Sequence, residues 1–285
     1  QVLQIEGVSD RLEHVKIREY GTPVNWHKPT SHVKLNLKEL EIDGRLDSHA
    51  LLLVASQHSV EKLDLHILDL AADFSTFHFP KIKELRLYGA KSTKIVCDLL
   101  AACGPELEEV HIRQTQNQDN DTFPDLHLSF PMLKEVSIDS TPVEILSLFL
   151  KHNHGAGLKS LGVCSAIACD YESAKQSWSE LFSEAKSLET IRVPASMLLH
   201  IPDIGLKSVT DLDLTESDFI GGNDFVITEQ IFQKVLLCEK LNNFYAAEVT
   251  SITANNWIGR ILEHLPLKKS LDVPKAKYEE GELDI

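Results

Sequence analysis

The chain has 285 residues, of which 43% are hydrophobic, and this is enough apolar material for one large core or for two ordinary ones. Asp and Glu outnumber Lys and Arg by 43 to 28, and the formal charge of -15 repels phosphate backbones without an obvious basic stripe to offset it. The composition therefore argues against nucleic acid as the main ligand and favours a basic protein partner, and the absence of an apolar run of about 18 to 20 residues argues against a membrane span.

A short apolar pattern recurs along the whole chain. In IKELRL it places apolar residues at Ile82, Leu85 and Leu87, and this spacing of three and then two fits neither an amphipathic helix nor an alternating strand. Successive copies start 21 to 32 residues apart, and SLDV around Leu271 is a weak eleventh copy. The ten clear copies, in chain order, begin at Leu12, Leu37, Val60, Ile82, Leu107, Leu133, Leu158, Leu188, Val209 and Leu241.

Each copy is interpreted as a turn that leads into a short strand. Leu85 and Leu87 follow the two-residue period of a strand, and Ile82 enters the same core from the preceding turn. One copy cannot bury this apolar wedge alone, whereas stacked copies lay their strands side by side, about 4.8 Å apart, as a parallel sheet. The repeats therefore predict a solenoid in which each strand contacts mainly its two neighbours.

The segments between the copies are predicted to return along the convex side of the solenoid. Apolar spacings of three to four residues indicate helices at residues 49–59, 93–103, 143–152, 171–185 and 228–238. A further helix at residues 253–265 is expected to cover the end of the core. The prediction is an α/β solenoid over residues 1–274, with the last repeat and its covering helix at about 241–274, followed by an acidic, mobile tail at 275–285.

The recurrence resembles that of leucine-rich repeat proteins over nearly the whole chain. This resemblance implies a horseshoe of about 10 to 11 repeats, with a parallel sheet on the concave face and helices and irregular segments on the convex face. The asparagine or cysteine that the consensus has three residues after the last core position is replaced, for example by Tyr20, Arg45 and Leu68. These divergent repeats resemble the F-box leucine-rich repeat family, in which the solenoid captures substrates for a cullin-based ubiquitin ligase. No F-box is recognisable and the repeats begin by Leu12, so a ligase adaptor is expected as a partner only if an F-box precedes this chain.

Three columns of side chains are expected on the concave face, from the positions between and just after the core residues. The first column carries Glu84, Glu109 and Glu135 on neighbouring strands, a row of like charges that a basic partner would relieve. Arginine, histidine and tyrosine side chains beside it are of types found at interface hot spots. The predicted partner-binding patch consists of His66, Glu84, Arg86, Tyr88, Glu109, His111, Arg113 and Glu135. The alternative is an ordinary solvated face, in which Arg86 forms weak ion pairs with Asp64 and Glu109 worth about 0 to 1 kcal/mol each.

Motifs of known catalytic or cofactor sites are not found in the chain. It has no nucleophile elbow, Walker loop or dinucleotide fingerprint, and neither GGND at 221–224 nor QNQDND at 116–121 completes a phosphate or calcium loop. We therefore expect no enzyme activity, no cofactor and no metal site. Five cysteines without a CxxC pair indicate reduced thiols and a cytoplasmic or nuclear location.

The leading hypothesis is a non-enzymatic scaffold that binds a protein or peptide on its concave face, as the substrate-recognition part of an F-box type cullin ubiquitin ligase. The first alternative is a structural or regulatory subunit held permanently in a larger intracellular complex. The second alternative is an enzyme with an unrecognised site. An F-box upstream of the repeats, or co-purification with the ligase adaptor, would separate the first two hypotheses.

Overall fold

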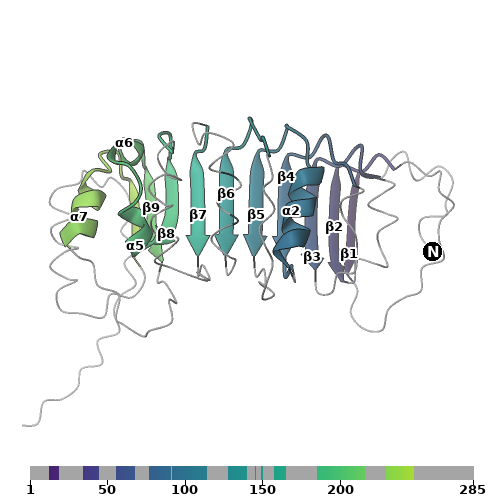
Figure 1. The fold of residues 1–285 in the computed structure, drawn as a ribbon, viewed down its shortest axis with the longest axis horizontal. Helices are drawn as coiled ribbons and strands as arrows, with labels where there is room; N and C mark the ends of the chain where they lie inside the picture. Colours follow the sequence, from purple (N-terminus) through teal and green to yellow (C-terminus); the bar gives the residue numbers. More distant parts are fainter. Residues whose placement is uncertain are drawn as a thin grey trace, which may run out of the picture.

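The fold is a parallel-strand solenoid with one strand in each predicted repeat (Figure 1). The computed structural model describes residues 13–18, 35–44, 56–67, 77–90, 92–113, 128–139, 145, 149, 157–164, 185–215 and 229–246. In these residues ten strands form one sheet in sequence order, and every neighbouring pair is parallel. The predicted parallel sheet is therefore confirmed.

Every strand begins two residues after the first apolar residue of a predicted copy. Strand β4, for example, begins at Glu84, two residues after Ile82. The strands are β1 His14–Arg18, β2 Glu39–Gly44, β3 Lys62–Ile67, β4 Glu84–Tyr88, β5 Glu109–Arg113, β6 Glu135–Asp139, β7 Ser160–Cys164, β8 Thr190–Pro194, β9 Asp211–Thr215 and β10 Asn243–Ala246.

A turn precedes the strand, as the spacing of three residues predicted. The amide of Leu133 donates to the carbonyl of Phe130 at 3.0 Å, and the amide of Val209 donates to the carbonyl of Leu206 at 3.1 Å. In both cases the bond spans three residues, as in a β-turn. The turn allows the first apolar residue of the copy to point into the same core as the strand residues that follow it.

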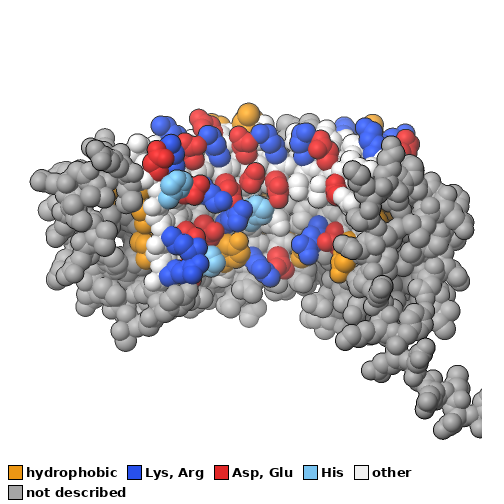
Figure 2. Space-filling view, turned by 180° about the vertical axis from the view of Figure 1, so that it is seen from behind, with side chains coloured by type: hydrophobic (Ala, Val, Ile, Leu, Met, Phe, Trp, Pro, Cys, Tyr) orange, Lys and Arg blue, Asp and Glu red, His pale blue; other side chains and the backbone are white. Residues whose placement is uncertain are grey.

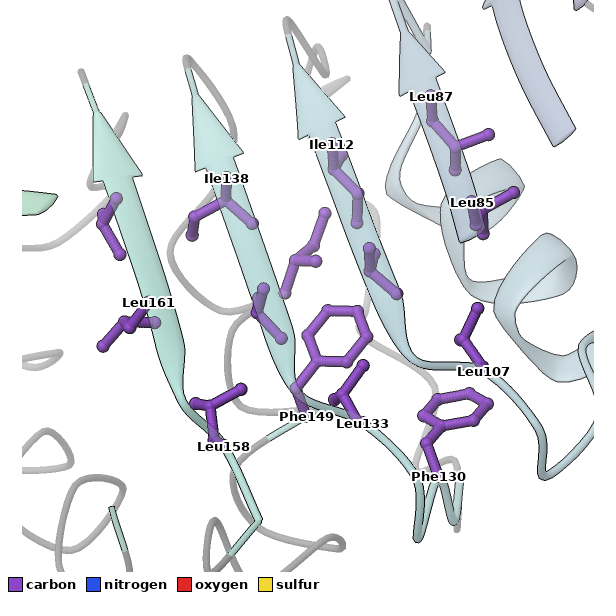
Figure 3. Packing of buried hydrophobic residues seen from close by; sticks show 14 of the residues in the cluster. Leu85, Leu87, Leu107, Ile112, Phe130, Leu133, Ile138, Phe149, Leu158 and Leu161 are labelled. Atoms are coloured by element: carbon purple, nitrogen blue, oxygen red, sulfur yellow. The ribbon is translucent and has the colours of Figure 1, made fainter. Parts of the chain in front are cut away.

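The core is a continuous layer built from equivalent residues of successive repeats. The first apolar residues of the copies from Leu37 to Leu241 are at most 5% exposed. Figure 3 shows Leu107, Leu133 and Leu158 aligned below the strand residues Ile112 and Leu161. Because each repeat buries its apolar residues against the next, the stability of the sheet depends on contacts between neighbours.

The helices agree only in part with the prediction. Helix α2 (Thr93–Ala102) and helix α7 (Glu229–Leu236) lie inside the predicted segments 93–103 and 228–238. Ser92 accepts a hydrogen bond at its Oγ from the amide of Ile95, so α2 begins with a side-chain cap. Two short helices, α5 (Ala195–Leu198) and α6 (Asp203–Leu206), were not predicted. The stretch 195–206 is long enough for one helix, but Pro202 lies between α5 and α6, and a proline interrupts a continuous helix.

Other predicted elements lie mostly or wholly outside the described residues. Of segment 143–152 only Ile145 and Phe149 are described, and both are helical and buried. Segment 49–59 is described from Ser56, where a helical residue is followed by a turn. The rest of these two segments, 171–184, the covering helix 253–265, the eleventh copy and the tail 275–285 are not described. Among the helices that are described, none combines the length and the apolar character needed to span a bilayer.

Candidate binding face

One face of the sheet, called here the open face, carries mainly polar and charged side chains. Helices α2, α5 and α7 lie on the other face, toward the viewer in Figure 1. Seen from behind, the sheet presents Lys, Arg, Asp, Glu and His side chains across the strands (Figure 2). The open face therefore corresponds to the face on which the sequence places the three columns.

The strand register aligns the predicted columns. In the first column Glu84 is paired with Glu109, and Glu109 with Glu135. In the second column Arg86 is paired with His111, and in the third column His66 is paired with Tyr88 and Tyr88 with Arg113. The eight predicted patch residues, called here the central patch, therefore lie together on β3 to β6.

The cations that neutralise Glu84 come from its own strand and from β3. Arg86 Nε lies 2.5 Å from Glu84 Oε1, and Lys62 Nζ lies 2.9 Å from Glu84 Oε2. Residues two apart on a strand point to the same face, which explains why Arg86 reaches Glu84. The alternative reading, an ordinary solvated face, expected direct ion pairs of Arg86 with Asp64 and Glu109. In the described part of the chain Arg86 pairs within 4 Å with Glu84 instead, although it still interacts electrostatically with Asp64.

Aromatic and arginine side chains of the central patch are ordered by their neighbours. The rings of His66 and Tyr88 stack with their centroids 4.4 Å apart and an interplanar angle of 25°. Arg113 Nε lies 2.7 Å from Asp139 Oδ2 on β6. These contacts fix the orientation of groups that would contact a partner, and such pre-organisation lowers the entropic cost of binding.

His111 stands between two carboxylates of the first column. Its Nε2 lies 4.0 Å from Glu109 Oε2 and 3.9 Å from Glu135 Oε1. Glu84, Glu109 and His111 each offer one possible metal-ligand atom, and these atoms lie within 4.8 Å of one another. The sequence analysis did not anticipate this grouping. Because both oxygens of Glu84 already face Lys62 or Arg86, the grouping is better described as part of a charge network than as a metal centre.

A half-buried carboxylate lies at the edge of the central patch. Burial raises the pKa of the Asp64 carboxyl; Glu41 adds to the increase, whereas His66, Arg86 and Lys62 oppose it. Asp64 Oδ1 lies 3.3 Å from His66 Nε2 but makes no hydrogen bond within the described residues. Burial in the folded protein therefore disfavours the charged form of Asp64, despite the nearby cations.

Replacement of this residue by asparagine, Asp64→Asn, is expected to keep or increase the free energy of unfolding at neutral pH. Because the pKa of Asp64 is raised on folding, the stability it contributes is fully present below the unfolded pKa of about 3.9 and is lost as the pH rises through the folded pKa. The Asp64→Asn variant should not show this loss of stability as the pH rises. Urea unfolding at a series of pH values checks it, with Glu39→Gln, which removes an exposed carboxylate on β2, as the control. A clear loss of stability at neutral pH in Asp64→Asn alone would contradict the prediction.

Charged side chains of alternating sign line the edge of the sheet at which the strands begin. Its members occupy the second position of the first six copies, one residue before the strand, and they were not recognised in the sequence analysis. Lys38 pairs with Glu13 at 2.9 Å and Lys83 with Glu61 at 2.7 Å. Hydrogen bonding to Lys83 is the main reason that the pKa of Glu61 is lowered. The sequence signal was present as the alternation Glu13, Lys38, Glu61, Lys83, Glu108 and Lys134.

A second feature of the open face, called here the C-terminal hollow, lies over β8, β9 and β10. Its volume is about 330 Å³, at the lower end of the range of ligand sites. The outward-facing residues that line it are Thr190, Arg192, Asp211, Asp213, Asn243 and Tyr245. These residues appeared in the predicted columns, but none was selected for the predicted patch.

The described cysteines form no disulfide with one another, and they lie in the protein interior or partly covered. Burial raises the pKa of Cys238 to about 12, which keeps this thiol protonated and unreactive. Cys169 lies outside the described residues.

Comparison with known proteins adds no family assignment. The fold and the open face define a parallel-strand solenoid with an extended polar surface. A search of protein-family models gives no match to the chain, and a search of curated proteins gives no significant similarity.

Proposed function

We propose that the chain is a non-enzymatic leucine-rich repeat scaffold that binds a protein partner on its open face. The observation that carries this proposal is the register of the ten strands, which aligns their outward side chains in continuous columns on one face. Solenoids use surfaces of this kind to contact extended partners. The leucine-rich repeat type is supported by the recurrence of the apolar pattern and by helices α2 and α7 in the predicted return segments.

The central patch has the composition expected at the centre of an interface. Tyrosine and arginine are enriched among residues that contribute most to binding, and both occur here beside carboxylates. The net charge of -15 favours a partner with basic segments. The partner is therefore proposed to be a protein or peptide that presents Lys or Arg toward Glu109 and Glu135, which are less neutralised than Glu84.

Reversal of two charges in the central patch, Arg86→Glu together with Arg113→Glu, is expected to weaken partner binding by about tenfold or more. The reason is that both substitutions remove a guanidinium group of the type found at interface hot spots, together with the ion pairs to Glu84 and Asp139 that order the central patch. Affinity purification from an extract, followed by mass spectrometry, identifies the partners, and binding of the purified partner to both proteins measures the change.

The matched control is Lys94→Glu, which reverses one exposed charge on α2, on the opposite side of the sheet. Circular dichroism and thermal unfolding establish that all variants are folded, and Tyr88→Ala provides a second variant if Arg86→Glu is unstable. Partner binding that is the same in the patch variants and in the control would refute the proposal.

The role in a ubiquitin ligase is a narrower form of this proposal. It is supported by the resemblance of the divergent repeats to F-box leucine-rich repeat proteins, and it implies a cytoplasmic or nuclear location. Co-purification of the natural gene product with the ligase adaptor tests it. Stable co-purification with other subunits, and without the adaptor, would instead favour a structural or regulatory subunit of a larger complex.

A further inference from the structure

The C-terminal hollow contains two carboxylates with very different surroundings. Asp211 accepts hydrogen bonds at both oxygens, from Asn243 Nδ2 at Oδ1 and from Thr210 Oγ1 at Oδ2, the latter at 2.6 Å. Asp213, paired with Tyr245 across β9 and β10, has one cation close to it among the described residues, Arg192. Asp211 is therefore satisfied by its neighbours, and Asp213 is not.

The unsatisfied atom of Asp213 is Oδ1. Arg192 Nε lies 3.0 Å from Asp213 Oδ2, but Oδ1 is buried and makes no hydrogen bond within the described residues. Burial raises the pKa of the Asp213 carboxyl, and the charge of Arg192 only partly offsets this effect. A buried acceptor without a donor costs free energy. The Asp213 side chain remains 26% exposed, and a cation placed against this exposed part offsets that cost electrostatically.

Charge decides which kind of ligand suits the hollow. Asp211 and Asp213 together outweigh the single guanidinium of Arg192, and that guanidinium is already paired. An anionic ligand would have to approach both carboxylates, whereas a cationic one is attracted by them. Tyr245, which is 40% exposed, adds an aromatic surface against which an aliphatic chain or a cation can pack.

From these contacts we infer that the C-terminal hollow receives a lysine or arginine side chain of the partner protein. The cationic head lies against the exposed part of the Asp213 carboxylate, and the aliphatic stem lies along the ring of Tyr245. This inference rests on the proposed function, because it assumes a protein partner on the open face. It adds an anchor for a basic residue at β8 to β10, apart from the central patch on β3 to β6.

Titration of the isotope-labelled full chain with short peptides tests the inference. Three acetylated and amidated pentapeptides carry Lys, Arg or Glu between four alanines, and backbone amide shifts are followed by NMR. We expect the Lys and Arg peptides to shift the amides of β8 to β10 and the Glu peptide to leave them unchanged. Asp213→Asn should weaken the binding of the cationic peptides by about tenfold, because it removes a charge-assisted hydrogen bond.

Further variants distinguish binding of the cationic side chain in the hollow from general attraction by the negatively charged protein. Tyr245→Phe should retain binding and Tyr245→Ala should weaken it, because only the ring is needed for packing. Glu39→Gln removes an equal charge on β2, far from the hollow, and should leave binding unchanged. Because the pKa of Asp213 is raised on folding, Asp213→Asn should remain folded, which thermal unfolding verifies.

Each outcome has a definite meaning. Preference for the Glu peptide, or no shift at β8 to β10 with any peptide, would overturn the inference. Binding of only one cationic peptide would support it and would identify the head group as ammonium or guanidinium. If partner binding depends on Arg86 and Arg113 but cationic peptides do not shift β8 to β10, the inference fails and the proposed function stands. If cationic peptides bind at β8 to β10 but no partner depends on the central patch, the proposed function fails and the binding of a basic side chain in the hollow stands.

Discussion

Replacement of Phe79 by alanine is expected to lower the free energy of unfolding by about 3 to 5 kcal/mol. Phe79 is 0% exposed and is among the largest fully buried side chains in the described residues. Its ring stacks on that of Phe77 with centroids 5.9 Å apart. Truncation would leave a cavity between the repeat of β4 and that of β5, and the surrounding backbone is not free to collapse into it.

The backbone around Phe79 is held by the neighbouring repeat. Its amide donates to the carbonyl of Ala102 at 2.7 Å, and its carbonyl accepts from the amide of Gly104 at 2.9 Å. Urea unfolding followed by circular dichroism measures the loss, and Met132→Ala, at a side chain that is 50% exposed, is the control. A loss in Phe79→Ala no larger than that in Met132→Ala would show that this ring does not support the core.

The second large effect is expected at Gly104, where the backbones of two repeats lie close together. A Cβ atom at this position would lie 2.3 Å from the carbonyl oxygen of Pro80 and 2.8 Å from its carbonyl carbon. These are backbone atoms that cannot rotate away. Gly104→Ala would therefore push apart the two backbone segments that pair at Phe79 and Cys103. We expect a loss of about 3 kcal/mol, measured by the same unfolding experiment.

Gly157 provides the matched comparison for this substitution. A Cβ atom there would lie 3.6 Å from the carbonyl oxygen of Leu133, an ordinary van der Waals contact. Gly157→Ala should therefore change stability by no more than about 0.5 kcal/mol. Equal losses in the two variants would mean that the contact with Pro80 is not the cause.

The repeat pattern was sufficient to place the sheet. Each copy carries its own turn and its own alternation of apolar residues, so local sequence determined where β1 to β10 begin. Stacking then determined the order and the register, since any slip by one residue would expose residues such as Leu85 and Leu87. The three columns of the open face followed directly from this register.

The contacts within the open face could not be read from the register alone. Arg86 had three carboxylates in reach, and its choice of Glu84 depends on side-chain conformations that the sequence does not specify. The C-terminal hollow depends on the exposure of Tyr245 and on the burial of Asp213, which are properties of packing. The short helices α5 and α6 escaped prediction because four residues are too few to show a periodicity.

Because the strands are parallel and in register, equivalent positions on successive strands are separated by a constant distance. His111 in the central patch and Asp213 in the C-terminal hollow occupy the same column, on β5 and β9, four strands apart. At about 4.8 Å per strand they are separated by roughly 19 Å, which an extended segment of about six residues spans. A partner that reaches both sites must therefore carry its contact residues at this spacing, and the number of repeats between the sites sets the length of the motif that the protein can recognise.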